Sequence, residues 1–172
     1  MKEDNKLPNF EKAVLPHLDA AYNLARWLVR NDADAEDVVQ EATLRAYKFF
    51  GGYRGGDGRA WLLTIVRNTC YTWLQQNRAH EPATDFDEET HGVENVTPET
   101  ILLGSVDRQM LKDALEELPV EFREAVILRE LEGLSYKEIA SVINVPVGTV
   151  MSRLARARKR LQLRLSGKEV SS

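Results

Sequence analysis

The chain has 172 residues, of which 43% are hydrophobic and 29% are charged, and its formal net charge is −4. This composition supports real hydrophobic cores in one ordinary domain or two small ones, which excludes disorder throughout. A single cysteine cannot build a disulfide framework or a cysteine-based zinc site. The N-terminal segment is charged and no apolar run approaches the roughly 18 residues of a membrane span, so we expect a soluble protein of the reducing cytoplasm.

Apolar residues recur at helical spacing almost throughout, and the expected fold is all-α. A first helix is predicted over about Phe10–Val29. A second helix is predicted to begin at the polar capping residues 31–34 and to run to about Phe50. Its apolar residues recur at helical spacing and are expected to face a core: Ala35, Val38, Val39, Ala42, Ala46, Phe49 and Phe50. The glycine-rich stretch Gly51–Gly58 ends that helix.

A third helix is predicted over about Arg59–Asn77, with a buried stripe formed by Leu62, Ile65, Val66, Thr69, Cys70, Trp73 and Leu74. Cys70 is therefore interpreted as a small core residue rather than a reactive thiol. Trp61 falls at the edge of the stripe, and its role stays open.

Helical periodicity fails after this segment, and residues 81–106 contain seven acidic and no basic side chains. We interpret this stretch as a flexible acidic linker between two small helical domains, 1–80 and 107–172. A solvated tether kept extended by charge repulsion is the simplest role for it.

Helix resumes near Thr97 and places Leu103, Val106, Met110, Ala114 and Leu118 on one face. Pro119 opens another helix, which Gly133 and Leu134 end with a left-handed stop.

The strongest local signal begins at Ser135, which forms a capping box with Glu138 and opens a short helix. Asn144 tolerates the left-handed conformation that ends this helix, and a longer helix follows over about Val147–Leu165. Two helices joined by such a short turn predict a helix-turn-helix.

The second of these helices has a face suited to a DNA major groove. Its inward residues are predicted to be Val150, Leu154, Ala157 and Leu161, and residues 150–168 carry seven basic and no acidic side chains. Arg156 can make bidentate contacts to guanine, and Ser152 can bond a base edge or a phosphate. A solvated basic helix end is the alternative.

Both halves of the chain resemble the extracytoplasmic-function (ECF) class of bacterial sigma factors. The C-terminal half resembles sigma region 4 through LPVEFREAVILRELEGLSYKEIASVINVPVGTVMSRLARARKRL. The N-terminal half resembles sigma region 2 through DADAEDVVQEATLRAYKFF, GYRGG and RAWLLTIVRNTCYTWLQQNR. The resemblance implies a transcription initiation factor that binds core RNA polymerase and directs it to specific promoters.

For the second helix, the resemblance implies a contact with the core polymerase through Asp37, Gln40, Glu41 and Leu44. A solvated helix face is the alternative reading of this stripe. In the family the acidic linker threads the polymerase cleft, which gives residues 81–106 a second possible role.

For DNA, the resemblance implies that the loop and the third helix read the melted minus-10 element through Tyr53, Arg54, Arg67, Asn68, Tyr71, Thr72 and Gln75. The alternative for Tyr53 and Arg54 is that they merely close a turn. The resemblance likewise implies that the following residues contact the minus-35 duplex: Thr149, Met151, Ser152, Arg153, Arg156, Arg158 and Lys159. Many relatives carry Arg at the position of Met151, which leaves the promoter sequence open.

Other functions fit less well. His17, His80 and His91 show no ligand spacing and no nucleophile motif is present, so neither an enzyme nor a bound metal or cofactor is expected. A stand-alone helix-turn-helix regulator acting as a dimer is the main alternative, and a sigma-factor mimic is a third. The resemblance further implies an anti-sigma factor as partner, no membrane insertion, and a monomer when partners are absent.

Overall fold

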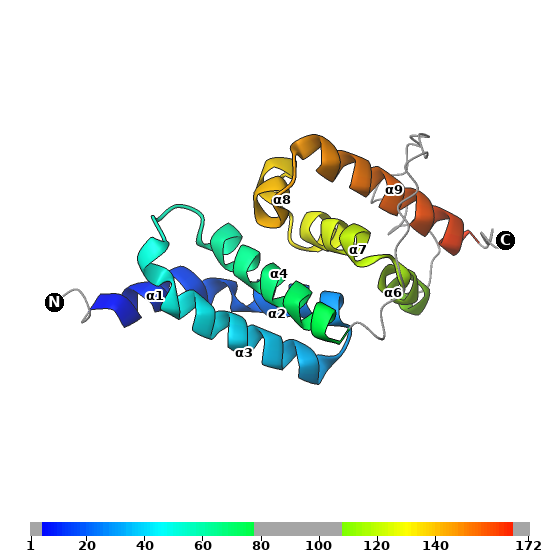
Figure 1. Cartoon of the computed structure of the whole chain (residues 1–172). Coiled ribbons are helices and arrows are strands. Elements are labelled where there is room, and N and C mark those ends of the chain that lie inside the picture. Colours follow the sequence, from blue (N-terminus) through cyan, green and yellow to red (C-terminus); the bar gives the residue numbers. More distant parts are fainter. Residues whose placement is uncertain (1–4, 78–107, 167–172) are drawn as a thin grey trace. The chain divides into compact units, whose positions relative to one another are not determined.

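The computed structural model describes residues 5–77 and 108–166, and within these ranges the regular structure is helical. The first helical unit contains α1 (Lys6–Val14), α2 (Leu18–Val29), α3 (Asp32–Lys48) and α4 (Gly58–Gln76), with short 3-10 turns η2 (Leu15–His17) and η3 (Phe50–Gly52). The second contains α6 (Arg108–Glu117), α7 (Val120–Val126), the π-helical turn η5 (Ile127–Leu131), α8 (Tyr136–Ile143) and α9 (Val147–Leu165). The all-α prediction is confirmed for the described residues (Figure 1).

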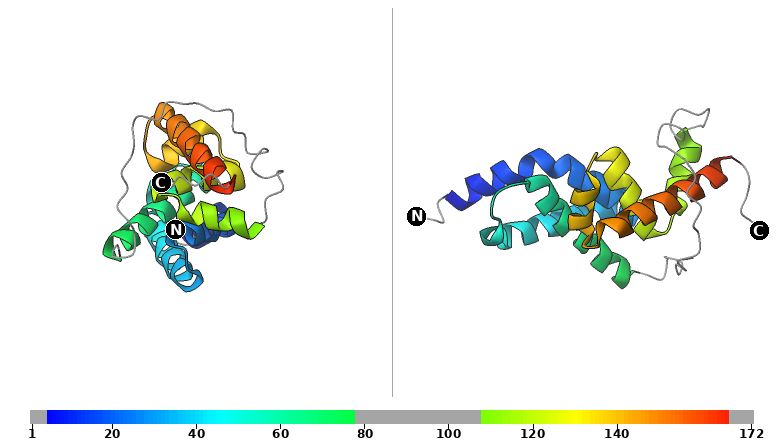
Figure 2. Two further views of the ribbon diagram at one scale, coloured as in Figure 1. Left: turned by 90° about the vertical axis from the view of Figure 1, so that its right-hand side faces the viewer. Right: turned by 90° about the horizontal axis from the view of Figure 1, so that it is seen from above.

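In the first unit, α2, α3 and α4 pack on one another, and α1 packs on α4 (Figure 2). Small side chains allow the close approach of α2 and α3, because the fully buried positions on these helices include Ala21, Ala25, Ala35, Ala42 and Ala46. From α4 the core receives Leu62, Leu63, Val66 and Cys70. The prediction that Cys70 is a core residue is confirmed.

The predicted single helix over Phe10–Val29 is wrong. The helical segment starts earlier, at Lys6, and the 3-10 turn Leu15–His17 divides it into α1 and α2. Pro16 lies in this turn, where its missing N–H and its ring prevent a continuous α-helical hydrogen-bond pattern. The break lets α1 follow its own direction and pack on α4.

The prediction that Phe49 faces the core is also wrong, since 59% of this residue is exposed. Asn31 caps α3 as expected, by accepting the backbone N–H of Asp34 at 2.9 Å, but the α-helix ends at Lys48. Phe49 lies beyond that end, so the helical spacing no longer determines which way it points. Five other residues predicted to be buried are only partly so: Val39, Phe50, Ile65, Trp73 and Leu74.

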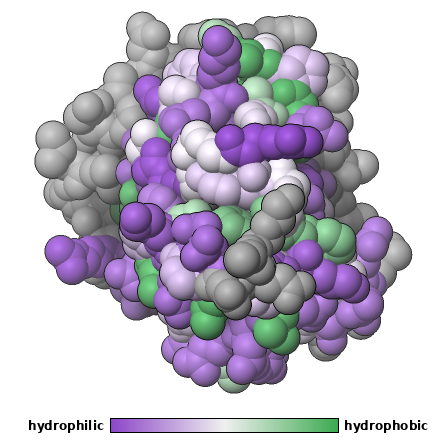
Figure 3. Space-filling model, turned by 90° about the vertical axis from the view of Figure 1, so that its left-hand side faces the viewer, coloured by the Kyte–Doolittle hydropathy of each residue, from purple (hydrophilic) through white to green (hydrophobic). Residues whose placement is uncertain are grey.

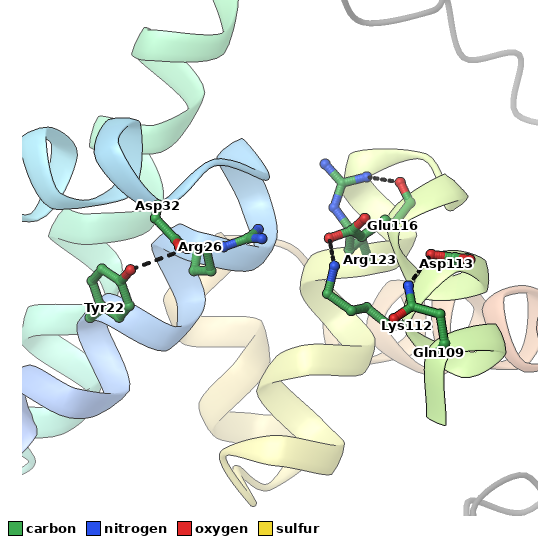
Figure 4. Close-up of polar contacts among 8 residues, drawn as sticks. All are labelled: Tyr22, Arg26, Asp32, Gln109, Lys112, Asp113, Glu116 and Arg123. Atoms are coloured by element: carbon green, nitrogen blue, oxygen red, sulfur yellow. Dashed lines mark hydrogen bonds and ion pairs between the residues drawn. The ribbon is translucent and has the colours of Figure 1, made fainter. Parts of the chain in front are cut away.

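The second unit is organised around α9, which packs on α7 and α6 (Figure 1). Its inward positions are buried as predicted, with exposed fractions of 2% or less for Val150, Leu154, Ala157 and Leu161. Met110, predicted on the inner face of its helix, is 42% exposed. Arg123 is fully buried, and its guanidinium donates to the carbonyl oxygen of Glu116 near the end of α6 (Figure 4). It also donates to the carbonyl oxygen of Leu118, just beyond that end. This contact satisfies carbonyls that the helix end leaves without a helical partner.

The acidic linker predicted at 81–106 lies outside the described residues, as do the predicted helix start at Thr97 and the residues Leu103 and Val106. The domain boundaries at 80 and 107 therefore stay predictions.

Candidate nucleic-acid and protein interfaces

The turn before α8 is built as the sequence predicts. Gly133 has φ +70°, and the backbone N–H of Leu134 donates to the Leu128 carbonyl at 3.0 Å. The capping box is closed in both directions: the Glu138 N–H donates to Ser135 Oγ at 3.0 Å, and the Ser135 N–H donates to Glu138 Oε1 at 2.8 Å. These contacts fix where α8 begins.

The turn between α8 and α9 is equally well defined. Asn144 has φ +60°, the left-handed conformation expected for it, and the Val145 N–H donates to the Ala140 carbonyl at 3.1 Å. Pro146 then caps α9, whose first turn is closed by the Thr149 N–H donating to the Pro146 carbonyl at 3.0 Å. The predicted helix-turn-helix, with its second helix over 147–165, is confirmed.

The outer face of α9 begins with two exposed residues, Met151 at 51% and Ser152. The hydroxyl of Ser152 donates to the Thr149 carbonyl at 3.2 Å, and its oxygen can still accept a hydrogen bond. Arg153, Arg156 and Lys159 continue this surface and are partly buried.

Arg158, Arg160 and Arg164 on α9 contact the rest of their own unit. Arg158 Nη2 lies 3.1 Å from Glu130 Oε2, with the two side chains only 19% and 22% exposed. The Arg160 guanidinium lies 5.2 Å from the Phe122 ring centroid, and Arg164 makes a two-pronged ion pair with Glu117. The π-helical turn η5 carries Glu130 and so aims it at α9. Residue spacing gave no sign of this pair, because its members are 28 positions apart.

The stripe on α3 is exposed as predicted: Asp37, Gln40, Glu41 and Leu44 all face outward. Leu44 is 67% exposed, the highest fraction among the large hydrophobic residues that the structure describes. Glu41 Oε2 pairs with Arg45 at 2.7 Å on the same face.

The start of α3, and with it the stripe, is tied to α2. The Asp32 carboxylate accepts the Arg26 guanidinium and the Tyr22 hydroxyl (Figure 4). Partial burial, followed by the Asp32 charge, raises the pKa of Tyr22 above its usual value.

The outer face of α4 brings together the polar residues predicted for minus-10 DNA. The Arg67 guanidinium stacks 3.8 Å from the Tyr71 ring centroid and donates to Asn68 Oδ1 at 3.3 Å. Asn68, Thr72 and Gln75 are exposed on the same helix. Arginine stacked on an aromatic ring, beside amide groups, matches the needs of unpaired bases.

The loop between α3 and α4 projects from the same unit. Gly55 and Gly56 have φ +88° and +82°, conformations that favour glycine, and Arg54 is exposed. Tyr53 is partly buried: its ring stacks on Phe50 at a centroid distance of 5.5 Å, and its hydroxyl donates to the Gly56 carbonyl at 3.0 Å. This placement favours the turn-closing alternative for Tyr53 and leaves Arg54 available at the loop tip.

Sequence reasoning did not identify the aromatic cluster behind this loop, which we define as Phe10, Tyr47, Phe50, Tyr53 and Trp61. Trp61, whose role was open, lies 5.0 Å from Tyr53 between ring centroids. The available signal was the enrichment of aromatic residues on both sides of a glycine-rich loop.

Large apolar surfaces are not evident in the view of Figure 3, where hydrophilic residues predominate and strongly hydrophobic ones show as small separate groups. Within residues 5–77 and 108–166, no helix has the length and apolar character needed to cross a membrane.

Comparison with known proteins identifies both units. Residues 13–80 match the family model "Sigma-70 region 2", and residues 108–161 match "Sigma-70, region 4". Together these matches contain the α3 stripe, the loop, the α4 face and α9 up to Leu161.

Individual relatives agree with these matches. The chain is 36% identical over 157 residues to the ECF RNA polymerase sigma factor SigE of Mycolicibacterium smegmatis, covering 91% of this chain but 61% of that relative, so it spans less than two thirds of that protein's length. It is 37% identical over 148 residues to the ECF RNA polymerase sigma-E factor of Haemophilus influenzae, covering 81% of this chain and 77% of the relative. Among solved structures, the sigma factor RpoE of Bartonella quintana, in complex with the anti-sigma factor NepR, matches with a TM-score of 0.70 and 30% identity over 94% of this chain and 99% of that one.

Proposed function

Because this chain belongs to the ECF RNA polymerase sigma factors, we propose that it binds core RNA polymerase and directs it to specific promoters as a transcription initiation factor. The observation that carries this proposal is the presence in one chain of a region 2 unit and a region 4 unit. In this account the chain itself performs no catalysis and works in the cytoplasm, where it meets the polymerase.

In the region 4 unit, α9 enters the major groove of the minus-35 element. Thr149, Met151 and Ser152 lie at the start of the helix, where close approach to base edges is possible. Arg156 reads guanine, and Arg153 and Lys159 contact the phosphate backbone. Arg158 holds α9 in place through Glu130, because its guanidinium is already engaged inside the unit.

In the region 2 unit, the α4 face and the loop hold the separated strand of the minus-10 element. The residues proposed for this are Arg54, Arg67, Asn68, Tyr71, Thr72 and Gln75, with Tyr53 at the base of the loop. Stacking is worth about 1–3 kcal/mol per base, which is comparable to the mean of about 1.4 kcal/mol that holds one base-pair step together. A few stacked bases can therefore keep a strand open without ATP.

The exposed stripe of α3 is the proposed contact with the core polymerase, through Asp37, Gln40, Glu41 and Leu44. Exposed Leu44 supplies apolar area that a contact with the polymerase can bury. The domains are proposed as 1–80 and 107–172, joined by the acidic segment 81–106. Because the Bartonella relative is solved with an anti-sigma factor, we include such a regulator among the partners of this chain.

Dependence on core polymerase tests this function. We expect the purified chain alone to be monomeric and to bind promoter duplex weakly, with a logarithmic salt slope of about 0.9 per phosphate contact. Adding core polymerase should produce tight, specific binding. If the chain alone dimerises and binds a palindromic duplex tightly, the stand-alone regulator is correct and the proposed function is wrong.

A further inference from the structure

Helix α1 packs against the first end of the loop that links α3 and α4. Phe10 on α1 is 6% exposed, and its ring meets Phe50 edge-on at a centroid distance of 5.5 Å and an interplanar angle of 86°. The same ring meets Tyr47, the last aromatic residue of α3, at 5.1 Å and 81°. Lys6, one turn earlier on α1, places its ammonium 4.3 Å from the centre of the Tyr47 ring. The loop therefore leaves α3 in contact with α1.

The second end of the loop meets the same helix. Gly58, the first residue of α4, is buried so close to α1 that an added Cβ would lie 2.6 Å from the backbone carbonyl oxygen of Ala13. Real Cβ atoms essentially never come this close to a backbone atom. Only glycine fits here without moving α1 away from α4, so both ends of the loop are held by one helix.

Between these two ends the loop has little burial of its own. Six of the seven residues from 51 to 57 are exposed. Tyr53 is the exception, and it leans on Phe50 and Trp61, which belong to the cluster that Phe10 supports. An exposed loop can present binding groups accurately only when a rigid scaffold fixes its ends.

We propose that α1 is a positioning element for minus-10 recognition, and that Phe10 is its main positioning residue. Phe10 lies outside the region 2 match, which begins at residue 13. In this proposal the loop presents Arg54 to the unstacked bases of single-stranded DNA, and Tyr53, packed on Phe50 and Trp61, fixes the base of the loop. This inference rests on the proposed function, and it assigns the choice of minus-10 sequence in part to a helix that touches no DNA.

The test uses the full chain, core polymerase and a promoter library randomised over the minus-10 element. The readout is the ratio of transcripts from preferred sequences to transcripts from singly substituted ones, measured beside affinity for core polymerase. For Phe10→Ala we expect this ratio to fall by about fivefold or more, the lower end of what one stacked base contributes, with core affinity unchanged. Leu7→Ala is the matched control, because Leu7 lies on the same helix and is 51% exposed.

Two further variants distinguish a loss of minus-10 discrimination from a general loss of stability. Leu28→Ala removes a fully buried side chain from the core without touching the loop, so it should lower thermal stability and leave the ratio intact. Phe10→Leu keeps apolar volume but removes the ring contacts. It replaces Phe10→Ala in the test if Phe10→Ala does not fold. For Phe10→Leu we expect the transcript ratio to fall by about threefold or more, which corresponds to part of one stacking contribution.

The inference is overturned if Phe10→Ala, or Phe10→Leu in its place, lowers total transcription while keeping the wild-type ratio, as expected for Leu28→Ala. If the wild-type protein with core polymerase shows no preference at all, the proposed function fails, and this inference fails with it. A wild-type preference that the Phe10 variants lose supports both.

Discussion

The ion pair between Glu130 and Arg158 provides a quantitative test of how the recognition helix is held. Its side chains are 22% and 19% exposed, and the 3.1 Å contact joins η5 to α9. Exposed pairs contribute about 0.2–1 kcal/mol, whereas breaking a fully buried pair costs about 3–5 kcal/mol. For this partly buried pair we expect Arg158→Ala to destabilise the packing of α9 by about 1–2 kcal/mol.

Hydrogen exchange of the α9 amides measures this effect in the full chain. A loss of that size should speed exchange of the most protected α9 amides by about 5- to 30-fold. Arg164→Ala is the matched control: its pair with Glu117 is on the same helix, but the side chains are 42% and 60% exposed, so the expected loss is within about 1 kcal/mol.

The salt dependence of promoter binding shows whether Arg158 positions α9 or contacts DNA itself. If Arg158 neutralised a phosphate, Arg158→Ala would reduce the logarithmic salt slope of promoter binding by about 0.9. We expect Arg158→Ala to leave that slope unchanged. We also expect the double variant Glu130→Arg with Arg158→Glu, which exchanges the two partners, to recover part of the hydrogen-exchange protection that Arg158→Ala loses. A reduced slope with unchanged hydrogen exchange would refute the reasoning.

The remaining predictions concern the other faces of the two units. Arg156→Ala should lose about 1–3 kcal/mol of minus-35 discrimination in competition binding with variant duplexes; reduced affinity for core polymerase with unchanged discrimination would contradict its assignment. Leu44→Ala should weaken core binding by more than about 1 kcal/mol, because an exposed apolar residue becomes buried in the complex, while thermal stability should change by no more than about 0.5 kcal/mol; unchanged affinity in a titration with core polymerase would remove it from the interface. Ser135→Ala should cost about 1 kcal/mol by opening the capping box, seen as faster exchange of α8 amides; protection equal to wild type would show that the cap contributes nothing.

Local chemistry made the helix-turn-helix predictable. Gly133, Ser135 and Asn144 each have a residue-specific reason for their conformation, namely a left-handed stop, a reciprocal cap and a left-handed turn. These reasons act within a few residues, so they can be found without knowing the fold. The inward face of α9 was equally accessible, because helical periodicity alone determines it.

Errors occurred where a helix ends or bends. Pro16 marked the break between α1 and α2, but the apolar pattern continued through it and favoured one long helix. Phe49 would continue the buried stripe of α3 only if the helix extended that far, but α3 ends one residue before it, at Lys48. Periodicity says nothing about side chains beyond the last helical turn.

Contacts between distant segments could not be predicted from the sequence. The engagement of Arg158 depends on the π-helical turn that aims Glu130 at it. The support of the loop by Phe10 and Gly58 depends on the direction of α1, which the break at Pro16 separates from α2. Such contacts follow from how helices pack, which composition and spacing do not determine.

Run-off transcription from a promoter library, with core RNA polymerase and with or without this chain, tests the central claim most directly. The account predicts that the chain selects a subset of promoters sharing a minus-35 and a minus-10 sequence at a fixed separation, and that core polymerase alone does not initiate at them. Equal initiation at those promoters in the absence of the chain would contradict it.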